Sequence, residues 1–319
     1  MNKDNYFESK KEVKWCPGCG NYSILNSMQK TLSYLNFETK NVVFVSGIGC
    51  SGRFPYYMNT NGFHTLHGRA PAVVTGLRLI RPDLHIWLVI GDGDGFSIGL
   101  SHLLHLVRRN MNINILFINN KVYALTKGQY SPTSNPNSIT KSSPYGSIET
   151  PINPLSLIFN AGTSFVARII DTDSTNSKDV INSAINHKGT SFIEVLQNCN
   201  IFNDRVYSKF TDKENKNENL LFLKNNSPLI FGIKEKKTLI IKDYKLIIDN
   251  LVNIKYENIL HHISDEENII QLLMINLGYN NIPLPVGIFK SINKECYEDS
   301  YKNKTSNNKL IKNLSDIFN

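Results

Sequence analysis

The chain has 319 residues, enough for one large domain or two of ordinary size. Hydrophobic residues make up 41% of it and charged residues 19%, a balance typical of globular proteins rather than disordered chains. The formal net charge is +8, but the lysines are scattered through polar stretches without interleaved aromatic residues, which argues against a nucleic-acid-binding surface.

Short runs of β-branched and aromatic residues predict buried strands. In chain order these runs are Asn41–Ser46, Leu84–Ile90, Ile113–Ile118, Ser164–Ile170 and Ser191–Leu196. Segments with helical spacing alternate with them, at Tyr22–Leu35, Ala70–Leu79, Ile98–Arg109 and Ser177–His187. The alternation predicts an α/β fold in which a parallel sheet is flanked by helices on both faces. Ligands of such sheets bind at the carboxyl ends of the strands.

Polar stretches divide the remainder of the chain. Pro132–Pro154 predicts a long loop, a feature that is usually functional inside a compact domain. The Lys- and Asn-rich stretch Lys209–Asn226 indicates a flexible connection, and Leu239–Ile248 and Leu284–Phe289 suggest a small C-terminal element. The prediction is therefore a main domain at 1–204 and a divergent C-terminal region at 205–319.

Polar residues follow two of the predicted strands. Asp92 and Asn120 stand 28 positions apart in Gly91-Asp92-Gly93-Asp94 and Asn119-Asn120. With the backbone carbonyl of Val122, they would offer three oxygens to Mg²⁺. The glycines leave room for a diphosphate, and a helix opening near Ser97 would point its amides at it. A plain Gly/Asp turn would explain GDGD alone, but strand–GDG–helix–strand–NN resembles the thiamine-diphosphate fingerprint.

The cysteines form a second candidate site. Cys16 and Cys19 make a C-x-x-C, Cys50 follows one predicted strand, and Cys199 ends another. Four thiolates suit either a [4Fe–4S] cluster or a tetrahedral zinc ion, and the spacing alone leaves both open. The neighbouring thiamine-diphosphate motif favours the iron–sulfur cluster, because electrons leaving the coenzyme need an acceptor. Cys296 lies in a polar stretch and is expected to be a bystander.

Other motifs carry less information. Gly47–Gly52 matches G-x-G-x-x-G, but the ribose-binding acid expected about 20 residues on is absent, because position 72 is Ala72. His64, His67 and Arg69 could hold a diphosphate or a carboxylate, although local capping explains each one equally well. Packing on the face of a helix is expected for His102 and His105. Thr126 and Gln129 can donate hydrogen bonds to phosphate.

Taken in order, WCPGCGNYSIL, SGIGCSGR, HTLHGRAPAVVTGLRL, GDGDGFSIG, NNKVYALTKGQYSPT and VLQNC closely resemble the β subunit of 2-oxoacid:ferredoxin oxidoreductases. The resemblance covers about residues 14–203 and resumes weakly at 283–297. It departs at Ile90, at Lys127 and at Leu100-Ser101, where the family usually has a small residue, Gly and Gly-Asn. None of these changes removes a predicted ligand.

The resemblance implies a thiamine-diphosphate-binding fold and assigns its ligands. Cys16, Cys19, Cys50 and Cys199 would hold a [4Fe–4S] cluster. Asp92, Asn120 and the Val122 carbonyl would hold Mg²⁺ on thiamine diphosphate. The other residues that it places around the coenzyme are Gly49, Ser51, Arg53, His67, Gly91, Gly93, Asp94, Tyr123, Ala124, Leu125 and Thr126. The candidates for a direct part in catalysis are His67, which belongs to this set, and Arg69, which lies two residues further on.

The activity implied is the oxidative decarboxylation of a 2-oxoacid, in which coenzyme A takes the acyl group and ferredoxin the electrons. 2-Oxoglutarate is favoured over pyruvate because of the short two-subunit form. A separate α subunit would supply the pyrimidine-binding domain, for which this sequence shows no candidate. The alternatives are a thiamine-dependent non-redox lyase, a zinc-stabilised nucleotide-binding module and a purely structural subunit.

The sequence also bears on location and partners. No apolar run reaches the ~18 residues of a membrane span, and Met1–Asn5 lack the apolar core of a signal peptide. We therefore expect a cytoplasmic protein with reduced cysteines and no membrane or nucleic-acid partner. The basic charge suits an acidic protein partner such as ferredoxin.

Overall fold

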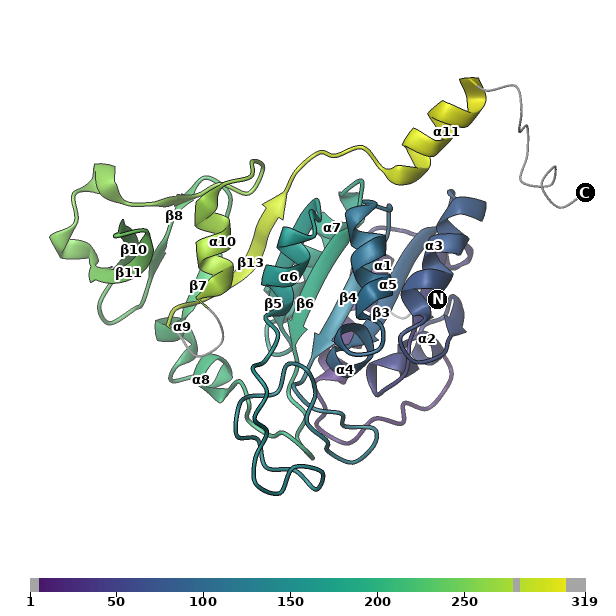
Figure 1. Ribbon diagram of the computed structural model, residues 1–319, viewed down its shortest axis with the longest axis horizontal. Helices are drawn as coiled ribbons and strands as arrows, with labels where there is room; N and C mark the ends of the chain where they lie inside the picture. Colours follow the sequence, from purple (N-terminus) through teal and green to yellow (C-terminus); the bar gives the residue numbers. More distant parts are fainter. Residues whose placement is uncertain (1–5, 278–281, 308–319) are drawn as a thin grey trace, which may run out of the picture.

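A large mixed sheet forms the centre of the computed structural model, which describes residues 6–277 and 282–307 (Figure 1). The first five residues, where no leader is expected, lie outside that range. The strands of this sheet are, in spatial order, β2 (Asn61–His64), β1 (Val42–Ser46), β3 (His85–Gly91), β4 (Asn114–Asn119), β6 (Ser191–Leu196), β5 (Phe165–Ile170), β13 (Leu284–Ser291) and β7 (Leu220–Leu223). The first six are parallel, whereas β13 pairs antiparallel with β5 and parallel with β7.

Helices cover both faces of the sheet because successive strand residues point to opposite sides. From β1, Val42 and Phe44 pack with α1 (Asn21–Tyr34) and α7 (Ser174–Asn186) in one apolar core. Their neighbours Val43 and Val45 pack in a second core. The helices of that second face are α3 (Ala70–Ile80), α5 (Leu100–Arg108), α6 (Pro154–Asn160) and α10 (Ile269–Asn276).

Further elements complete the chain. The helical ones are η2 (Thr39–Asn41), η3 (Ser51–Arg53), α2 (Phe54–Tyr57), α4 (Asp92–Phe96), α8 (Ser208–Thr211), α9 (Lys216–Asn219), η4 (Leu251–Asn253), η5 (Tyr256–Asn258) and α11 (Tyr297–Asn307). A small sheet joins β9 (Ile230–Phe231), β10 (Lys237–Lys242) and β11 (Lys245–Asn250), and β8 (Ser227–Pro228) pairs with β12 (His261–His262). Figure 1 shows the β10–β11 hairpin beside α10, apart from the large sheet. No helix of the described segments has the length and apolar character needed to cross a membrane.

The α/β fold, the five predicted strands and the four predicted helices are confirmed, with ends that differ by at most three residues. The long loop at 132–154 is also confirmed, because irregular backbone runs from the end of β4 to α6. The helix predicted to open near Ser97 is α5, which begins at Leu100, but a further short helix that was not predicted, α4, begins at Asp92 directly after β3 and has Ser97 as its C-cap. The strand β2 was not predicted.

The C-terminal region differs more from expectation. The flexible connection predicted at 209–226 is wrong, because this stretch forms α8, α9 and β7, and Leu220 and Leu221 are buried. Leu284–Phe289 belongs to the large sheet as β13 rather than to a separate small element. Two strands from beyond residue 204 thus extend the main sheet, and the boundary at 204/205 stays a prediction.

Candidate active site

The predicted metal ligands lie at the carboxyl ends of two adjacent strands. β3 and β4 are paired in parallel, with Gly91 opposite Ile118, so Asp92 and Asn120 both emerge at the same rim. In Figure 1 the loop that follows β4 and the N-terminal segment gather at this rim, below the sheet. The two side chains that the sequence assigned to one metal site therefore share one edge and line one cavity.

Asp92 is almost completely buried, with 3% of the residue exposed. Its Oδ2 atom accepts hydrogen bonds from the hydroxyls of Ser131 at 2.5 Å and Thr133 at 2.9 Å. Burial raises the pKa of Asp92 to about 6, and the two hydroxyls act against that shift. A divalent cation would remove most of the cost of burying this carboxylate. The environment of Asp92 therefore suits a metal ligand, because two hydroxyls fix the orientation of its carboxylate.

Asn120 reaches the same cavity from the first turn after β4. Its Oδ1 accepts the backbone N–H of Val122 at 3.2 Å, and its Nδ2 donates to Gln197 Oε1 at 3.1 Å. Lys121, between the two ligands, has φ +56°, a left-handed conformation that turns the chain back toward the rim. The donor set of one carboxylate, one amide oxygen and one carbonyl suits Mg²⁺, with phosphate and water completing six oxygens.

Asp94 lines the same cavity but uses its carboxylate to hold two loops. Its Oδ1 accepts the backbone N–H groups of Ile48 at 3.1 Å and Gly68 at 2.8 Å, and His67 Nδ1 lies 3.3 Å away. A β-carbon on Gly47 would stand only 1.8 Å from Oδ2, so this close approach needs glycine. Burial raises the pKa of Asp94. The second acid of GDGD thus connects the loops that follow β1 and β2.

The cavity brings together most of the residues assigned to the coenzyme. Its volume is about 70 Å³. The predicted residues along its walls are Gly49, Ser51, His67, Gly91, Asp92, Gly93, Asp94, Asn120, Val122, Tyr123, Ala124, Leu125 and Thr126. A β-carbon on Gly93 would lie 2.2 Å from the ring of Tyr123, whose hydroxyl donates to the Gly93 carbonyl at 3.1 Å. The segment 123–126 therefore lies directly against the GDGD turn.

Some candidates lie elsewhere. The Arg69 guanidinium contacts the ring of His102, outside the cavity walls. His64 Nδ1 lies 2.7 Å from the Gly52 carbonyl, so this ring contacts the backbone of η3 outside the coenzyme cavity. Gln129 donates to the Thr126 carbonyl and accepts from the Thr126 hydroxyl, so the two bond to each other. His105 is exposed on α5 and accepts a hydrogen bond from Arg108.

The four predicted cluster ligands all line a second cavity, which has a volume of about 230 Å³. Cys16, Cys19, Cys50 and Cys199 contribute to it together with Arg53, whereas Cys296 is buried elsewhere. Burial raises the pKa of Cys19 to about 12 and that of Cys50 to about 11, with a further contribution from the neighbouring thiols. Such thiols ionise when a metal binds them. In the described segments no three His, Cys, Asp or Glu side chains are grouped to hold a single metal ion.

The two cavities adjoin. Cys50, Asn120, Ala124 and Leu125 line both of them. The C-x-x-C loop is held in place by Trp15, whose indole N–H donates to the Cys50 carbonyl at 2.7 Å, and by Asn200, which donates to the Pro17 carbonyl at 2.7 Å. A metal–diphosphate group in one cavity and a sulfur-held cluster in the other would be immediate neighbours.

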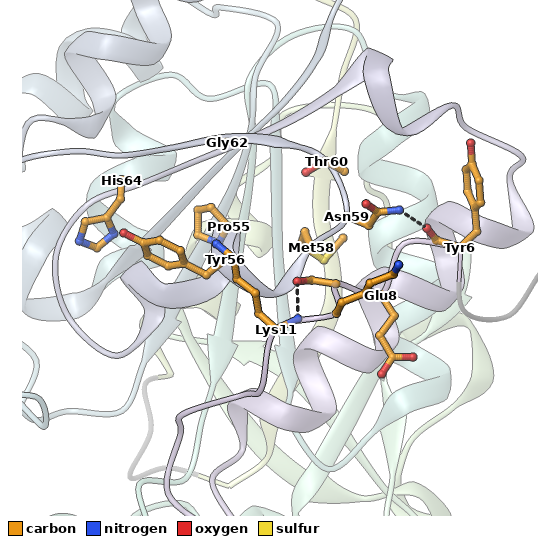
Figure 2. A pocket seen from close by; sticks show the side chains of 12 residues that line it. Tyr6, Glu8, Lys11, Pro55, Tyr56, Met58, Asn59, Thr60, Gly62 and His64 are labelled. Carbon is orange, nitrogen blue, oxygen red and sulfur yellow. Dashed lines mark hydrogen bonds between the residues drawn. The ribbon is translucent and has the colours of Figure 1, made fainter.

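Another cavity, of about 870 Å³, lies beside β2 (Figure 2). Tyr6, Tyr56 and Met58 are among its lining residues, and Asn59 donates to the Tyr6 carbonyl at 3.0 Å. His64 is the one candidate residue among its lining residues, and none of them is a predicted ligand of the metal or of the cluster. This cavity is therefore a groove between the N-terminal segment and the edge strand β2, separate from the predicted metal and cluster sites.

Sequence reasoning missed three residues of this region. Ser131 and Thr133 stand in the motif YALTKGQYSPT, but nothing in the pattern indicates that they reach back to Asp92. Gln197, two residues before Cys199, contacts both predicted sites. For Gln197 the available signal was a polar residue directly after the predicted strand Ser191–Leu196.

Comparisons with known proteins agree with this geometry. Residues 47–195 match the thiamine pyrophosphate enzyme C-terminal TPP binding domain. The chain is 41% identical over 304 residues to the 2-oxoglutarate oxidoreductase subunit KorB of Mycobacterium tuberculosis, an alignment that covers 95% of this chain and 81% of the relative. It is 37% identical over 213 residues to the 2-oxoglutarate synthase subunit KorB of Methanocaldococcus jannaschii, covering 67% and 77%.

Two further similarities were found. The β subunit of 2-oxoacid:ferredoxin oxidoreductase 1 from Aeropyrum pernix is 44% identical over 196 residues, an alignment that spans 61% of this chain and 62% of the relative. A structure of 2-oxoglutarate:ferredoxin oxidoreductase from Magnetococcus marinus, with 2-oxoglutarate, coenzyme A and succinyl-CoA bound, matches with a TM-score of 0.76. That match has 28% identity and covers 100% of this chain and 94% of the other.

Proposed function

Since the chain belongs to the family of 2-oxoacid:ferredoxin oxidoreductase β subunits, we propose that it is the coenzyme- and cluster-binding half of such an enzyme. The reaction is the coenzyme A-dependent oxidative decarboxylation of a 2-oxoacid. The observation that carries the proposal is the wall shared by the two cavities, formed by Cys50, Asn120, Ala124 and Leu125. Centres that exchange electrons must lie close together, and groups bound in two cavities that share a wall would do so.

The first cavity suits Mg²⁺ and the diphosphate of the coenzyme. Asp92, Asn120 and the Val122 carbonyl would hold the metal ion, with oxygen ligands of the kind that Mg²⁺ prefers. Ser131 and Thr133 fix the carboxylate of Asp92. When bound, thiamine diphosphate supplies the nucleophilic carbon and stores the electrons released by decarboxylation. The chain's own residues position that group and shield it from water.

Tyr123–Thr126 form the part of the wall that must adjust to a ligand. The cavity of about 70 Å³ holds only a few water-sized groups. Leu125, at the outer side, is 50% exposed, so this segment can move outward more easily than the buried GDGD turn. We infer that the coenzyme enters by displacing this segment.

The second cavity suits a [4Fe–4S] cluster. Four thiols line it, which is the number of protein ligands that such a cluster takes. Basic residues stand at the same cavity, namely Lys14, Arg53 and Lys127. Their charge favours the approach of an acidic electron carrier, and ferredoxin is the acceptor that this family name implies.

An α subunit would complete the site. Apolar side chains near the rim are strongly exposed, with Leu66 at 75% and Ile98 at 56%. These residues lie in loops next to Gly68 and Asp94, around the coenzyme cavity. Exposed apolar surface beside a binding site is typical of a protein interface. We infer that the pyrimidine-binding domain of a partner chain covers this surface.

2-Oxoglutarate is the proposed substrate, in preference to pyruvate. Two relatives with more than two thirds of their length aligned carry 2-oxoglutarate in their names, and the solved structure with a TM-score of 0.76 binds 2-oxoglutarate and coenzyme A. The location proposed is the cytoplasm, where thiols stay reduced.

The test is anaerobic purification of the chain with and without its α subunit, followed by analysis of iron, sulfide, magnesium and thiamine diphosphate. The complex should reduce ferredoxin or viologen dye with 2-oxoglutarate and coenzyme A faster than with pyruvate. The chain alone should be inactive. A colourless protein that contains zinc, or steady turnover by the single chain, would overturn the proposal.

A further inference from the structure

Gln197 lies between the two predicted sites. It follows β6 directly and is fully buried, with 0% of its surface exposed. Its backbone N–H donates to the Asn119 carbonyl at 3.0 Å, which continues the pairing of β6 with β4. The position of this residue is therefore set by the sheet, and its side chain points into the cysteine cavity, which it lines.

On one side, the Gln197 side chain contacts the metal site. Its Oε1 accepts a hydrogen bond from Nδ2 of Asn120 at 3.1 Å. An amide has distinct donor and acceptor ends, so this bond fixes which end of the Asn120 side chain faces which way. The oxygen of Asn120, the atom that a metal ion needs, is kept away from Gln197.

On the other side, Gln197 contacts the cluster site. Its Nε2 lies 3.5 Å from Sγ of Cys19 and donates to it, and the second proton of the same nitrogen goes to the Asn198 carbonyl. The amide thus uses one acceptor and two donors, its principal hydrogen-bonding capacity. A fully used buried amide has little freedom to rotate, so its two contacts are maintained together.

We propose that Gln197 is a positioning residue that connects the two centres, orienting Asn120 for the metal ion and donating a hydrogen bond to the Cys19 sulfur of the cluster. The inference rests on the proposed function, since it assumes that a metal ion and a cluster occupy the two cavities. It assigns one neutral side chain to both of them.

Each contact has a measurable consequence. Residues that orient a metal ligand typically change metal affinity by about 10- to 100-fold when they are removed. Hydrogen bonds to the sulfurs of an iron–sulfur cluster help to set its reduction potential, because they stabilise the more negative, reduced state. Loss of the Gln197 side-chain amide should therefore weaken metal binding and lower the potential of the cluster.

Two variants separate these effects. Gln197→Leu removes both contacts, so Mn²⁺, used as a paramagnetic probe in the presence of thiamine diphosphate, should bind about 10- to 100-fold more weakly. The cluster potential, followed by an EPR-monitored redox titration, should become more negative. Gln197→Glu keeps an acceptor for Asn120 but removes the donor to sulfur. It should retain Mn²⁺ affinity while its potential falls.

Lys127→Gln is the matched control. Lys127 is exposed and lines the same cysteine cavity. Removing its positive charge changes the charge at the cavity by the same one unit as Gln197→Glu, without removing a hydrogen bond to the Cys19 sulfur, so the potential should shift less. All variants are measured as the complex with the α subunit, at equal iron content.

The outcomes are distinguishable from those of the proposed function. A wild-type complex without iron, sulfide or bound Mn²⁺ would overturn the proposed function itself. A wild-type complex with both centres, and a Gln197→Leu variant whose potential and Mn²⁺ affinity are unchanged, would overturn only the role of Gln197. A change in one property alone in Gln197→Leu would contradict the connection between the sites.

Discussion

Ser131 and Asp92 are joined by a hydrogen bond of 2.5 Å although 39 residues separate them in the sequence. Thr133 Oγ1 lies 2.9 Å from the same Asp92 oxygen and also 2.9 Å from Asn119 Oδ1. The long loop after β4 therefore returns to the rim and supports the carboxylate that follows β3. This arrangement explains why a polar loop stays buried at these positions.

The first prediction concerns this support. Thr133→Val and Ser131→Ala should each weaken Mn²⁺ binding by about 10-fold or more, because the Asp92 carboxylate loses a group that orients it. Mn²⁺ affinity is measured by EPR in the presence of thiamine diphosphate. Thr163→Val is the control, since Thr163 is equally buried but donates to the Ile158 carbonyl, away from the rim. Equal Mn²⁺ affinity in Thr133→Val and wild type would contradict this role.

The second prediction concerns the thiols. Replacing any one of Cys16, Cys19, Cys50 and Cys199 by Ser should remove most of the bound iron and the visible absorbance, because each would supply one of four thiolate ligands. Cys296→Ser should keep both, since Cys296 is buried outside the cysteine cavity. Iron and sulfide analysis of anaerobically purified variants provides the measurement. Full iron content in Cys199→Ser would show that the quartet is assigned wrongly.

The third prediction compares two glycines. A β-carbon at Gly93 would lie 2.2 Å from the ring of Tyr123, so Gly93→Ala should displace the segment 123–126 and abolish binding of thiamine diphosphate while iron is retained. At Gly76, in α3, a β-carbon would meet no heavy atom within 4 Å. Gly76→Ala should therefore bind the coenzyme normally and stabilise the helix by about 0.5–1 kcal/mol.

Isothermal titration with thiamine diphosphate and Mg²⁺, together with thermal unfolding, distinguishes these cases. Tight coenzyme binding by Gly93→Ala would contradict this prediction, because it would mean that the GDGD turn accepts a β-carbon beside the Tyr123 ring.

The five strands could be predicted because buried parallel strands appear as continuous apolar runs such as NVVFVS and LHIWLVI. The strand β2 could not, since its residues Asn61–His64 are all exposed and show no apolar pattern. Leu220–Leu223 was hidden within Lys- and Asn-rich sequence, and its burial depends on pairing with β13, about 60 residues further on. Pairings at this separation leave no local signal.

The same distinction applies to the site. That Asp92 and Asn120 line one cavity and the four cysteines a second one was predictable from their residue types and spacing, whereas their roles as metal ligands stay a prediction. The contacts of the residues around them were not predictable. Arg168 and Glu194 form a fully buried ion pair at 2.7 Å, and Glu194 also accepts from Asn119, yet each stands in an apparently ordinary strand. Only the adjacency of β5 and β6 brings them together.

The last prediction concerns acid stability. His187 follows α7, and its Nε2 lies 2.8 Å from the hydroxyl of Ser164. Burial lowers the pKa of His187 to about 4 from an unfolded value of about 6.5. The unfolded chain therefore binds one more proton than the folded chain between these values, so His187 reduces the free energy of unfolding as the pH falls from about 6.5 to 4.

His187→Gln removes the titrating group, and the decline in stability over this pH range should become shallower by up to one proton. Thermal unfolding of the two proteins at pH 7, 5.5 and 4.5 tests this expectation. His105→Gln, at an exposed position on α5, controls for the loss of a histidine as such. If wild type and His187→Gln lose stability in parallel as the pH falls, protonation of the buried imidazole contributes nothing to acid unfolding, and other titrating groups determine it.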